Sequence, residues 1–288
     1  AFDEMGKPRA QLFAVVDKAL EAGQSTQKDL ANGQTSLFGA FAAAKSAKTG
    51  ETISSTVTEW YPEDAEWSEK QTLRLEKESL GFYISGHPLD SYAKDLGWLA
   101  SNNTSTPADA AKGSGRFNNQ ISLAGIIGSM RDRPLKSGKG RMAFVQLEDL
   151  HGSCEVIVFS KVFQIAEEML RGDDPILVRG SPAVEGDDGE IVKVRAKEIQ
   201  LLADVRAEKT SNMEISINTK DAIEQNLQKL QLLLNSSSGH VDTRLKIVEP
   251  GVFETIIKLP PQLKTHPTDE LLAQLGKLFG KQAVQLSC

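Results

Sequence analysis

Between residues 121 and 199, apolar and polar positions alternate with the period of two that is typical of β-strands. Five such runs occur, and a segment whose apolar residues have helical spacing lies between the third run and the fourth. The runs span residues 121–131, 141–148, 154–159, 175–184 and 190–199, and the helical segment spans residues 161–170. Gly125 and Gly128 lie in the first run, where a strongly bent strand needs residues without a side chain. The pattern predicts a small closed barrel.

The order of these elements is three strands, one helix and two further strands, which is the order of the OB-fold. Residues 149–153 form a short connection of turn-forming residues, so the second and third runs make a hairpin. We therefore predict an OB-fold β-barrel that binds nucleic acid over residues 119–203, within a multidomain chain of mixed α and β class.

An apolar stripe at helical spacing predicts a helix near the start of the chain. Pro8 suits its first turn, and we expect Gly23 to end it. The stripe consists of Leu12, Val15, Val16, Ala19 and Leu20. Because the short segment around it cannot bury this stripe, we expect the helix to dock on a larger body. Residues 24–33 are expected to be irregular or to form one weak helix.

Two segments rich in small and polar residues, 45–58 and 101–118, are interpreted as linkers. They separate a helical segment at residues 1–44 from a helical junction at residues 59–100, and the junction from the barrel. Within the junction, a capping-box pair predicts the start of a helix that runs from Glu69 to about Phe82. The pair is Ser68 and Gln71.

Residues 213–288 show the order strand, helix, two strands, helix and strand, after a charged connector at residues 203–212. Thr219 is expected to cap the first helix and Thr268 the second. The strands are expected at residues 213–217, 243–248, 252–259 and 282–286. The order βαββαβ is that of a small split α/β domain. Since it shows no carboxylate cluster, phosphate-binding loop or nucleophile with a base, we interpret it as an interaction module.

Composition narrows the functional classes. The 288 residues carry a net charge of −6, so nucleic acid must be bound by a local patch and not by the whole surface. Cys154 and Cys288 have no metal-ligand spacing and form no disulfide framework. Because no apolar run approaches 18 residues and the chain starts at Ala1 without a signal pattern, we expect a fragment of a cytoplasmic protein.

The strongest local positive charge lies after the first barrel strand. Five cations occur there against the single acid Asp132: Arg131, Arg133, Lys136, Lys139 and Arg141. OB-folds bind single strands through cations that follow phosphates and aromatic residues that stack on bases. Phe144 is the first stacking candidate and Phe159 the second, although alternation leaves burial of Phe144 in the core as the other possibility. The acidic residues between 185 and 190 would repel phosphates, so we expect only one mouth of the barrel to bind.

A five-residue peptide in the N-terminal segment resembles the one by which bacterial DNA polymerases and repair proteins bind the sliding clamp. It consists of Gln34, Thr35, Ser36, Leu37 and Phe38. Leu37 and Phe38 could fill an apolar pocket while the Gln34 amide makes directional hydrogen bonds at its rim, with Ser36 as the small residue between them. The alternative is that Leu37 and Phe38 are ordinary packing residues of a loop.

The most specific string of the chain lies at residues 76–90. It reads Glu76, Lys77, Glu78, Ser79, Leu80, Gly81, Phe82, Tyr83, Ile84, Ser85, Gly86, His87, Pro88, Leu89 and Asp90. The string closely resembles the segment before the OB domain in the alpha subunits of bacterial DNA polymerase III, the family C replicative polymerases. His87 could cap a backbone carbonyl or pack in the junction, and a metal role is not expected because no second His or Cys lies near it.

The resemblance implies that the chain is the C-terminal region of such a subunit. Its barrel would bind single-stranded template DNA, its peptide the beta sliding clamp, and its last domain the tau subunit of the clamp loader, among other subunits of a cytoplasmic, nucleoid-associated replisome. The parent would be a DNA-directed DNA polymerase whose Mg²⁺-holding carboxylates lie in an upstream palm domain. We therefore expect no catalytic residue, metal or cofactor in this chain, and no polymerase activity from it alone.

Two other readings compete. The first is a stand-alone OB-fold protein that binds single-stranded DNA or tRNA, and it leaves the strings at residues 34–38 and 80–90 unexplained. The second is an enzyme of unknown type, and it needs a catalytic constellation that the sequence does not show.

Overall fold

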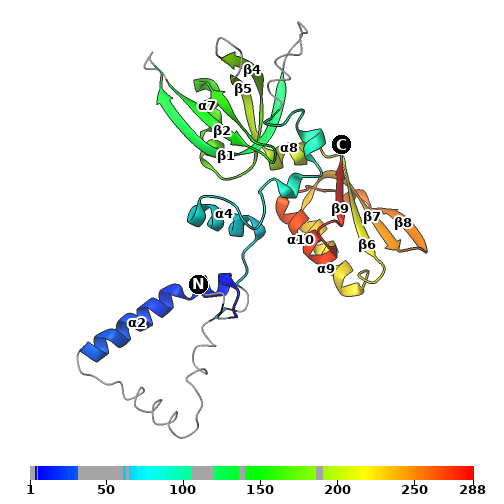
Figure 1. Cartoon of the computed structure of the whole chain (residues 1–288). Coiled ribbons are helices and arrows are strands. Elements are labelled where there is room, and N and C mark those ends of the chain that lie inside the picture. The colour runs from blue at the N-terminus through cyan, green and yellow to red at the C-terminus, as the bar shows by residue number, and fades with distance from the viewer. Residues whose placement is uncertain are drawn as a thin grey trace. The chain divides into compact units, whose positions relative to one another are not determined.

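The computed structural model describes residues 4, 6–31, 61–62, 65–105, 120–135, 140–185 and 191–288. The chain forms two compact units, Ala1–Ser85 and Gly86–Cys288. The second unit holds the end of the junction from Gly86 on, the barrel with its helix α7, and a separate four-stranded sheet near the C-terminus (Figure 1). The expectation of mixed α and β class with a five-stranded barrel and a βαββαβ domain is confirmed.

The described residues of the first unit form the helices α1 (Arg9–Ala14), α2 (Val16–Ala31) and α4 (Glu69–Leu80). The expectation that Gly23 ends the first helix is wrong, since α2 continues through it, and the break lies at Val15 instead. A glycine inside an exposed helix costs only about 1 kcal/mol, which the flanking turns can offset. Val15 is buried, and the Phe13 ring meets the Trp67 ring edge-on at 5.7 Å.

The capping box predicted at the start of α4 is confirmed. Ser68 Oγ accepts a hydrogen bond from the Gln71 amide at 3.2 Å, and the Gln71 side chain accepts one from the Ser68 amide at 3.0 Å. The helix ends at Gly81, whose φ of 83° lies in the left-handed region that favours glycine. Beyond it, the Glu76 carboxylate accepts hydrogen bonds from the amides of Ile84 and Ser85, each at 3.0 Å. This part of the string is therefore held in a fixed turn.

The junction continues with η3 (Asp90–Tyr92) and α5 (Leu96–Leu99). His87 takes part in the hydrogen bonds of the turn after α4. Its Nδ1 accepts a hydrogen bond from the Leu89 amide at 3.1 Å, and its own amide donates to Asp90 at 2.6 Å. The turn directs the junction's apolar side chains toward the barrel, where they form a shared core. That core consists of Leu89, Tyr92, Leu99, Ala124, Leu177, Leu202 and Val205.

The barrel is closed and has the strand order β1-β2-β3-β5-β4. Its elements are β1 (Ile121–Pro134), β2 (Arg141–Glu148), β3 (Ser153–Val158), α7 (Ser160–Arg171), β4 (Ile176–Glu185) and β5 (Ile191–Leu201). All neighbouring strands are antiparallel except β3 and β5. Helix α7 turns Phe163, Ala166 and Leu170 into the barrel core. This confirms the predicted OB-fold architecture.

The predicted bend of β1 is also confirmed. The register between β1 and β2 shifts between Ile127 and Ser129, so a bulge lies at Gly128. A Cβ atom at Gly125 would lie 2.7 Å from the backbone oxygen of Glu148, a contact that real side chains do not make. The glycines therefore let the strand curve so closely over β2 that the barrel closes.

The segment expected to be a charged connector is a helix with a buried side. Helix α8 (Leu202–Lys209) follows β5 directly, and its buried residues are Leu202, Val205, Arg206 and Ala207. The sequence pattern did not predict this helix, because the charged residue Arg206 lies on its buried side, where it belongs to an ionic cluster.

Arg206 is only 1% exposed and lies at the centre of this cluster. Its guanidinium donates to Asp269, lies 3.8 Å from the Asp95 carboxylate and stacks over the Tyr92 ring at 4.3 Å. Tyr92 in turn donates its hydroxyl hydrogen to Asp269 at 2.7 Å. Burial raises the pKa of Asp95, although Arg206 partly opposes the shift. The cluster joins the junction, the barrel and the C-terminal domain.

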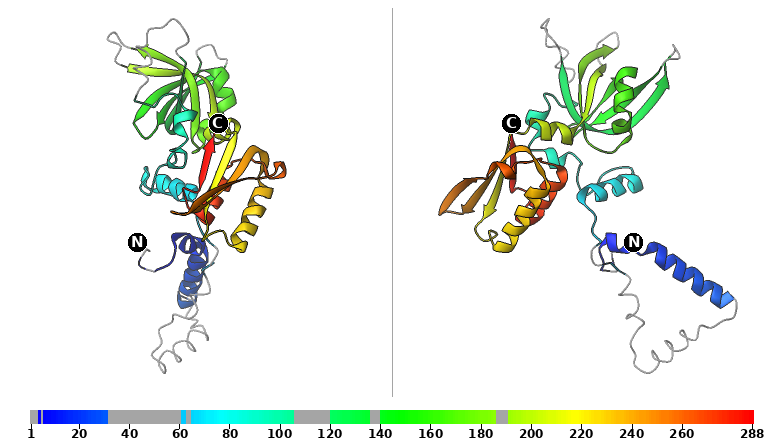
Figure 2. Two further views of the ribbon diagram at one scale, coloured as in Figure 1. Left: turned by 90° about the vertical axis from the view of Figure 1, so that its right-hand side faces the viewer. Right: turned by 180° about the vertical axis from the view of Figure 1, so that it is seen from behind.

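The C-terminal domain contains a sheet in the order β8-β7-β6-β9. Its elements are β6 (Asn212–Asn218), α9 (Glu224–Ser236), β7 (Ser238–Glu249), β8 (Phe253–Lys258), η4 (Pro261–Leu263), α10 (Asp269–Phe279) and β9 (Val284–Ser287). Both long helices pack on one face of the sheet, as the two further views show (Figure 2). The domain therefore leaves the other face of its sheet without a covering helix.

Two expectations about this domain are wrong. The parallel strands β6 and β7 are direct neighbours, so the βαβ unit is not split by a strand between them. Strand β8 is joined to β7 by a tight turn at residues 250–252 and pairs with the side of β7 that faces away from β6. Thr219 does not cap the first helix, which begins at Glu224, whereas Thr268 does cap α10 by accepting a hydrogen bond from the Leu271 amide.

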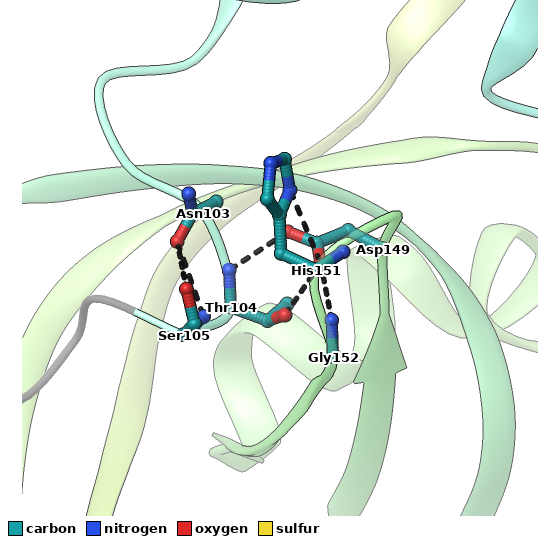
Figure 3. A network of polar contacts seen from close by, with 6 residues as sticks. All are labelled: Asn103, Thr104, Ser105, Asp149, His151 and Gly152. Carbon is teal, nitrogen blue, oxygen red and sulfur yellow. Dashed lines mark hydrogen bonds and ion pairs between the residues drawn. The ribbon is translucent and has the colours of Figure 1, made fainter.

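A polar network attaches the end of the junction to the barrel (Figure 3). The Asp149 carboxylate, in the β2–β3 turn, accepts hydrogen bonds from the amide and hydroxyl of Thr104 at 2.7 and 2.6 Å. It also accepts from the amides of His151 and Gly152 at 2.7 and 3.0 Å. Burial alone would raise the pKa of Asp149, but these bonds outweigh it and hold the pKa below its usual range. The start of the expected linker at 101–118 is therefore tied to the barrel, and residues 106–119 lie outside the described residues.

Replacing Arg206 by Ala is expected to lower the free energy of unfolding by about 3–5 kcal/mol, because it leaves the buried Asp95 carboxylate without its counter-ion. Arg179 offers the matched control. It makes an exposed ion pair with Glu198 at 3.0 Å, and its replacement by Ala should cost less than about 1 kcal/mol. Urea unfolding of both variants measures the difference, and equal costs would contradict a central role for Arg206.

Replacing Asp149 by Asn should lower stability by about 1–3 kcal/mol at neutral pH, since the carboxylate is the acceptor for four donors. The folded-state pKa of Asp149 is lowered, so its contribution is complete above the unfolded pKa of about 3.9 and is lost as pH falls through the folded pKa. Thermal unfolding between pH 7 and pH 2.5 should show the difference from wild type shrinking with acid. Glu168→Gln, at an exposed position of α7, is the control.

Candidate nucleic-acid interface

Strand β2 places Phe144 on the outer face of the barrel. Its neighbours Ala143 and Val145 are buried in the core, whereas Phe144 is half-buried on the other side of the strand. Alternation of a strand's side chains between the two faces of a sheet produces this arrangement. The possibility that Phe144 belongs to the core is therefore excluded, and its ring lies where a base could reach it.

The strand register aligns Phe144 with residues of three other strands. Arg131 of β1 and Ile157 of β3 are its direct partners, and Ile157 is in turn the partner of Arg195 on β5. Directly paired residues share one face of a sheet. The half-buried Phe144 and the buried Ile157 thus form an apolar centre with one arginine on each side across the four strands. We call this surface the outer face and define it by the row Arg131, Phe144, Ile157 and Arg195.

Neighbouring rows extend the outer face. Arg133 is the partner of Met142, two residues along β1 and β2 from the first row and on the same face. Phe159, the second stacking candidate, follows β3 and has 46% of its surface exposed. Arg131 and Arg133 have no ion-pair partner among the described residues, so both charges are available to a ligand.

The cations on β5 that line the second side of the outer face were not predicted from the sequence. Lys193, Arg195 and Lys197 alternate there with Val194 and Ala196, both of which are buried. Lys193 makes an ion pair with Glu155 at 3.0 Å, whereas Arg195 and Lys197 are exposed and have no ion-pair partner within the described part of the chain. Three cations at every second position of a predicted strand were the signal that could have revealed this border.

Arg141 does not join the other predicted residues. It has the parity of the core residues Ala143 and Val145, and its guanidinium donates to Asp132 at 2.6 and 2.8 Å. Asp132 also lies 3.7 Å from Arg171 of α7. The charge of Arg141 is therefore compensated on the α7 side of the strand. Of the predicted residues that the structure describes, Arg131, Arg133 and Phe144 come together.

Several predicted residues lie outside the described part of the chain. These are Lys136 and Lys139 of the basic segment, the acidic residues between 186 and 190, and the clamp peptide residues Gln34, Ser36, Leu37 and Phe38. Their roles stay predictions.

Few side chains among the described residues are suited to metal binding or covalent catalysis. They contain no group of three or more His, Cys, Asp or Glu side chains that could hold a metal ion. Burial, with a smaller contribution from Asp149, raises the pKa of the Cys154 thiol to about 12, so this cysteine is no nucleophile at neutral pH. Among the same residues, no helix is long and apolar enough to span a membrane.

The outer face combines an aromatic and apolar strip with cations on both borders. A single strand that crosses the four strands could place its phosphates near the cations while its bases stack on Phe144. A double helix offers no unstacked bases to such a strip. The arrangement is therefore suited to single-stranded nucleic acid.

Comparison with known proteins agrees with this geometry. Residues 121–203 match the family model described as an OB-fold nucleic acid binding domain. The DNA polymerase III subunit alpha of Haemophilus influenzae is 28% identical over 287 residues, covering 99% of this chain and 23% of that protein. The same subunit of Mycobacterium tuberculosis is 31% identical over 280 residues, and that of Escherichia coli K12 is 26% identical over 290 residues.

This chain spans less than a quarter of the length of these curated relatives, 22–23% in each case, whereas the similarity covers 97–99% of the chain itself. The resemblance expected from the string at residues 76–90 is thus confirmed: along nearly its whole length, this chain is similar to a region of the bacterial DNA polymerase III alpha subunit.

Proposed function

We propose that this chain is the non-catalytic C-terminal part of a replicative DNA polymerase and that its barrel binds single-stranded template DNA on the outer face. The observation that carries the proposal is the row of Arg131, Phe144, Ile157 and Arg195 across four barrel strands. It provides a stacking surface and two borders of positive charge on a chain whose net charge is −6. The matched OB-fold family and the similarity to polymerase subunits support the same conclusion.

The proposed binding is weak and tolerant of sequence. The outer face offers backbone phosphates a few cations, and it offers bases the faces of Phe144 and Phe159 instead of hydrogen-bonding pockets. Such contacts hold any base, and their phosphate component weakens as salt competes for the cations. A domain of this kind guides a moving template strand, whereas tight and specific binding would retain it.

The chain also tethers the polymerase to its partners in this proposal. The peptide from Gln34 to Phe38 binds the beta sliding clamp, with Leu37 and Phe38 as anchors. The C-terminal domain binds the tau subunit of the clamp loader. Support for these roles comes from the resemblance of the peptide and from the position of a compact domain without catalytic residues after the barrel.

Nucleotidyl transfer belongs to the rest of the parent protein in this proposal. That reaction needs Mg²⁺ held by carboxylates at the primer terminus, and the described residues of this chain hold no such cluster. The chain contributes positioning of the template and attachment to the replisome.

Binding of a fluorescent 20-nucleotide single strand, measured by anisotropy at several salt concentrations, tests the outer face. Phe144→Ala should cost about 1–3 kcal/mol of affinity through the lost stacking contact. Replacing both Arg195 and Lys197 by Ala should reduce the slope of log affinity against log salt by about 1.4. The charge-matched control replaces Lys220 and Lys229 of the C-terminal domain, and it should leave both quantities unchanged. Equal loss in the control, or tighter binding of tRNA than of DNA, would contradict the proposal.

A pull-down with purified beta sliding clamp tests the tether. The intact chain should be retained, and the variant with Gln34, Leu37 and Phe38 replaced by Ala should be lost, because it lacks both apolar anchors and the directional amide. Thr35→Ala is the matched control within the peptide, since position 35 is neither anchor nor rim contact. Equal retention of the triple variant would remove the clamp from the list of partners.

A further inference from the structure

Strand β8 and the last residue of the turn before it carry large apolar side chains that do not pack in the core. Val252, Phe253, Ile256 and Ile257 are 75%, 46%, 57% and 47% exposed. No residue of β8 belongs to the core that the helices α9 and α10 form with the rest of the sheet, and all six of its residues are exposed. Apolar surface of this kind is typical of an interaction site when it is concentrated on one element.

The strand is an open edge of the sheet. β8 pairs only with β7 and stands at one end of the order β8-β7-β6-β9, at the outer side of the domain (Figure 1). The pairing runs without a bulge from Arg244 and Lys258 to Glu249 and Phe253. Natural edge strands are commonly shielded by bulges or proline, and β8 has neither.

The backbone of this edge is ready to accept another strand. The Leu259 amide donates to the Thr243 carbonyl at 3.1 Å, so residues of the parity of 259 turn their backbone groups toward β7. Since this direction alternates along a strand, Glu254, Ile256 and Lys258 turn their N–H and C=O groups away from the sheet. Among the described residues, no strand lies beyond them. The outward N–H and C=O groups of β8 therefore have the spacing needed for hydrogen bonds with an added antiparallel or parallel strand.

The charges of the hairpin indicate the chemistry of the added strand. Lys258 is directly opposite Arg244. The hydrogen bond from Lys264 at 3.2 Å, together with the charges of Lys258 and Arg244, lowers the pKa of Asp242, so three cations share this one carboxylate. Like charges in direct opposition destabilise a strand pair, and a nearby carboxylate would relieve them. Glu254 already has a partner, because its carboxylate lies 2.7 Å from Lys246. The charge left open at this edge is therefore positive.

We propose that β8 is the docking edge for an extended, apolar and acidic segment of a partner protein, which joins the sheet as a strand beside β8. The inference rests on the proposed function of the C-terminal domain as a partner-binding module and assigns the surface that it uses. Main-chain hydrogen bonds supply affinity in such strand addition, and alternate side chains supply specificity. An apolar residue of the partner lies against Ile256, and an acidic one lies near Lys258.

A second copy of this chain fits the edge less well. It could offer only its own six-residue β8, and such a contact falls short of the roughly 1,200 Å² that stable complexes of folded proteins bury. A flexible partner segment is not restricted to the area of six paired residues, because it can also contact the apolar side chains on both faces of β8.

The test measures binding of the full 288-residue chain to two probes, purified tau subunit and a synthetic ten-residue peptide that alternates Val and Asp. Ile256→Pro removes an outward amide while the hydrogen bonds to β7 stay, and Ile256→Lys changes only the side chain. Both should lower affinity for either probe at least tenfold. Ile165→Lys, on α7 where Ile165 is 80% exposed, is the matched control and should change nothing. Lys258→Glu should reverse the preference, so that a Val and Lys peptide binds better than the acidic one.

The outcomes separate this inference from the proposed function. If tau binds and the edge variants bind it equally well, the inference is overturned although tethering stands. If tau does not bind but the acidic peptide binds and is lost in both Ile256 variants, the edge is supported and tethering through tau fails. If wild type binds neither probe, the inference is overturned. Concentration-dependent dimers that Ile256→Lys abolishes, seen by analytical ultracentrifugation in the absence of peptide binding, would overturn it in favour of a second copy.

Discussion

The buried guanidinium of Arg206 is the interaction on which the organisation of residues 86–288 depends. A buried charge is costly unless it is paired, and the partners of Arg206 come from separate parts of the chain. Asp95 and Tyr92 belong to the junction, Asp269 opens α10, and Arg206 itself lies in α8 directly after the barrel. The charge is satisfied only when junction, barrel and C-terminal domain all meet. A segment that resembles a connector in the sequence is thus the point where three parts are joined.

The barrel shows a second constraint, which is geometric. Strand β1 must curve over β2 closely enough to close the sheet, and Gly125 and Gly128 permit this because they have no side chain in the gap. The register that follows sets Arg131 opposite Phe144 and carries the same row to Arg195. The composition of the outer face is therefore a consequence of how the barrel closes.

The two domains of the second unit use their sheets in different ways. The barrel has no open edge, so it can offer a ligand only its faces. The C-terminal sheet keeps an open edge at β8, where backbone groups and apolar side chains are available to another chain. This difference matches the two roles proposed for the chain, which are guidance of a template strand and docking of a partner segment.

Local sequence determined most of the elements. Period-two alternation, turn residues and the glycines of β1 predicted the barrel, and side-chain oxygens at Ser68 and Thr268 predicted two helix starts, because each of these signals acts within a few residues. The tertiary structure alone decided what depends on partners distant in the chain. Strand register separated Arg141 from Phe144 and brought Arg195 to the outer face, and direct pairing of β6 with β7 left β8 at the edge of the sheet. Packing turned Arg206 from an apparent surface charge into a buried one. A local pattern indicates which side of a helix or strand is apolar, but only the tertiary structure shows which other element packs against that side.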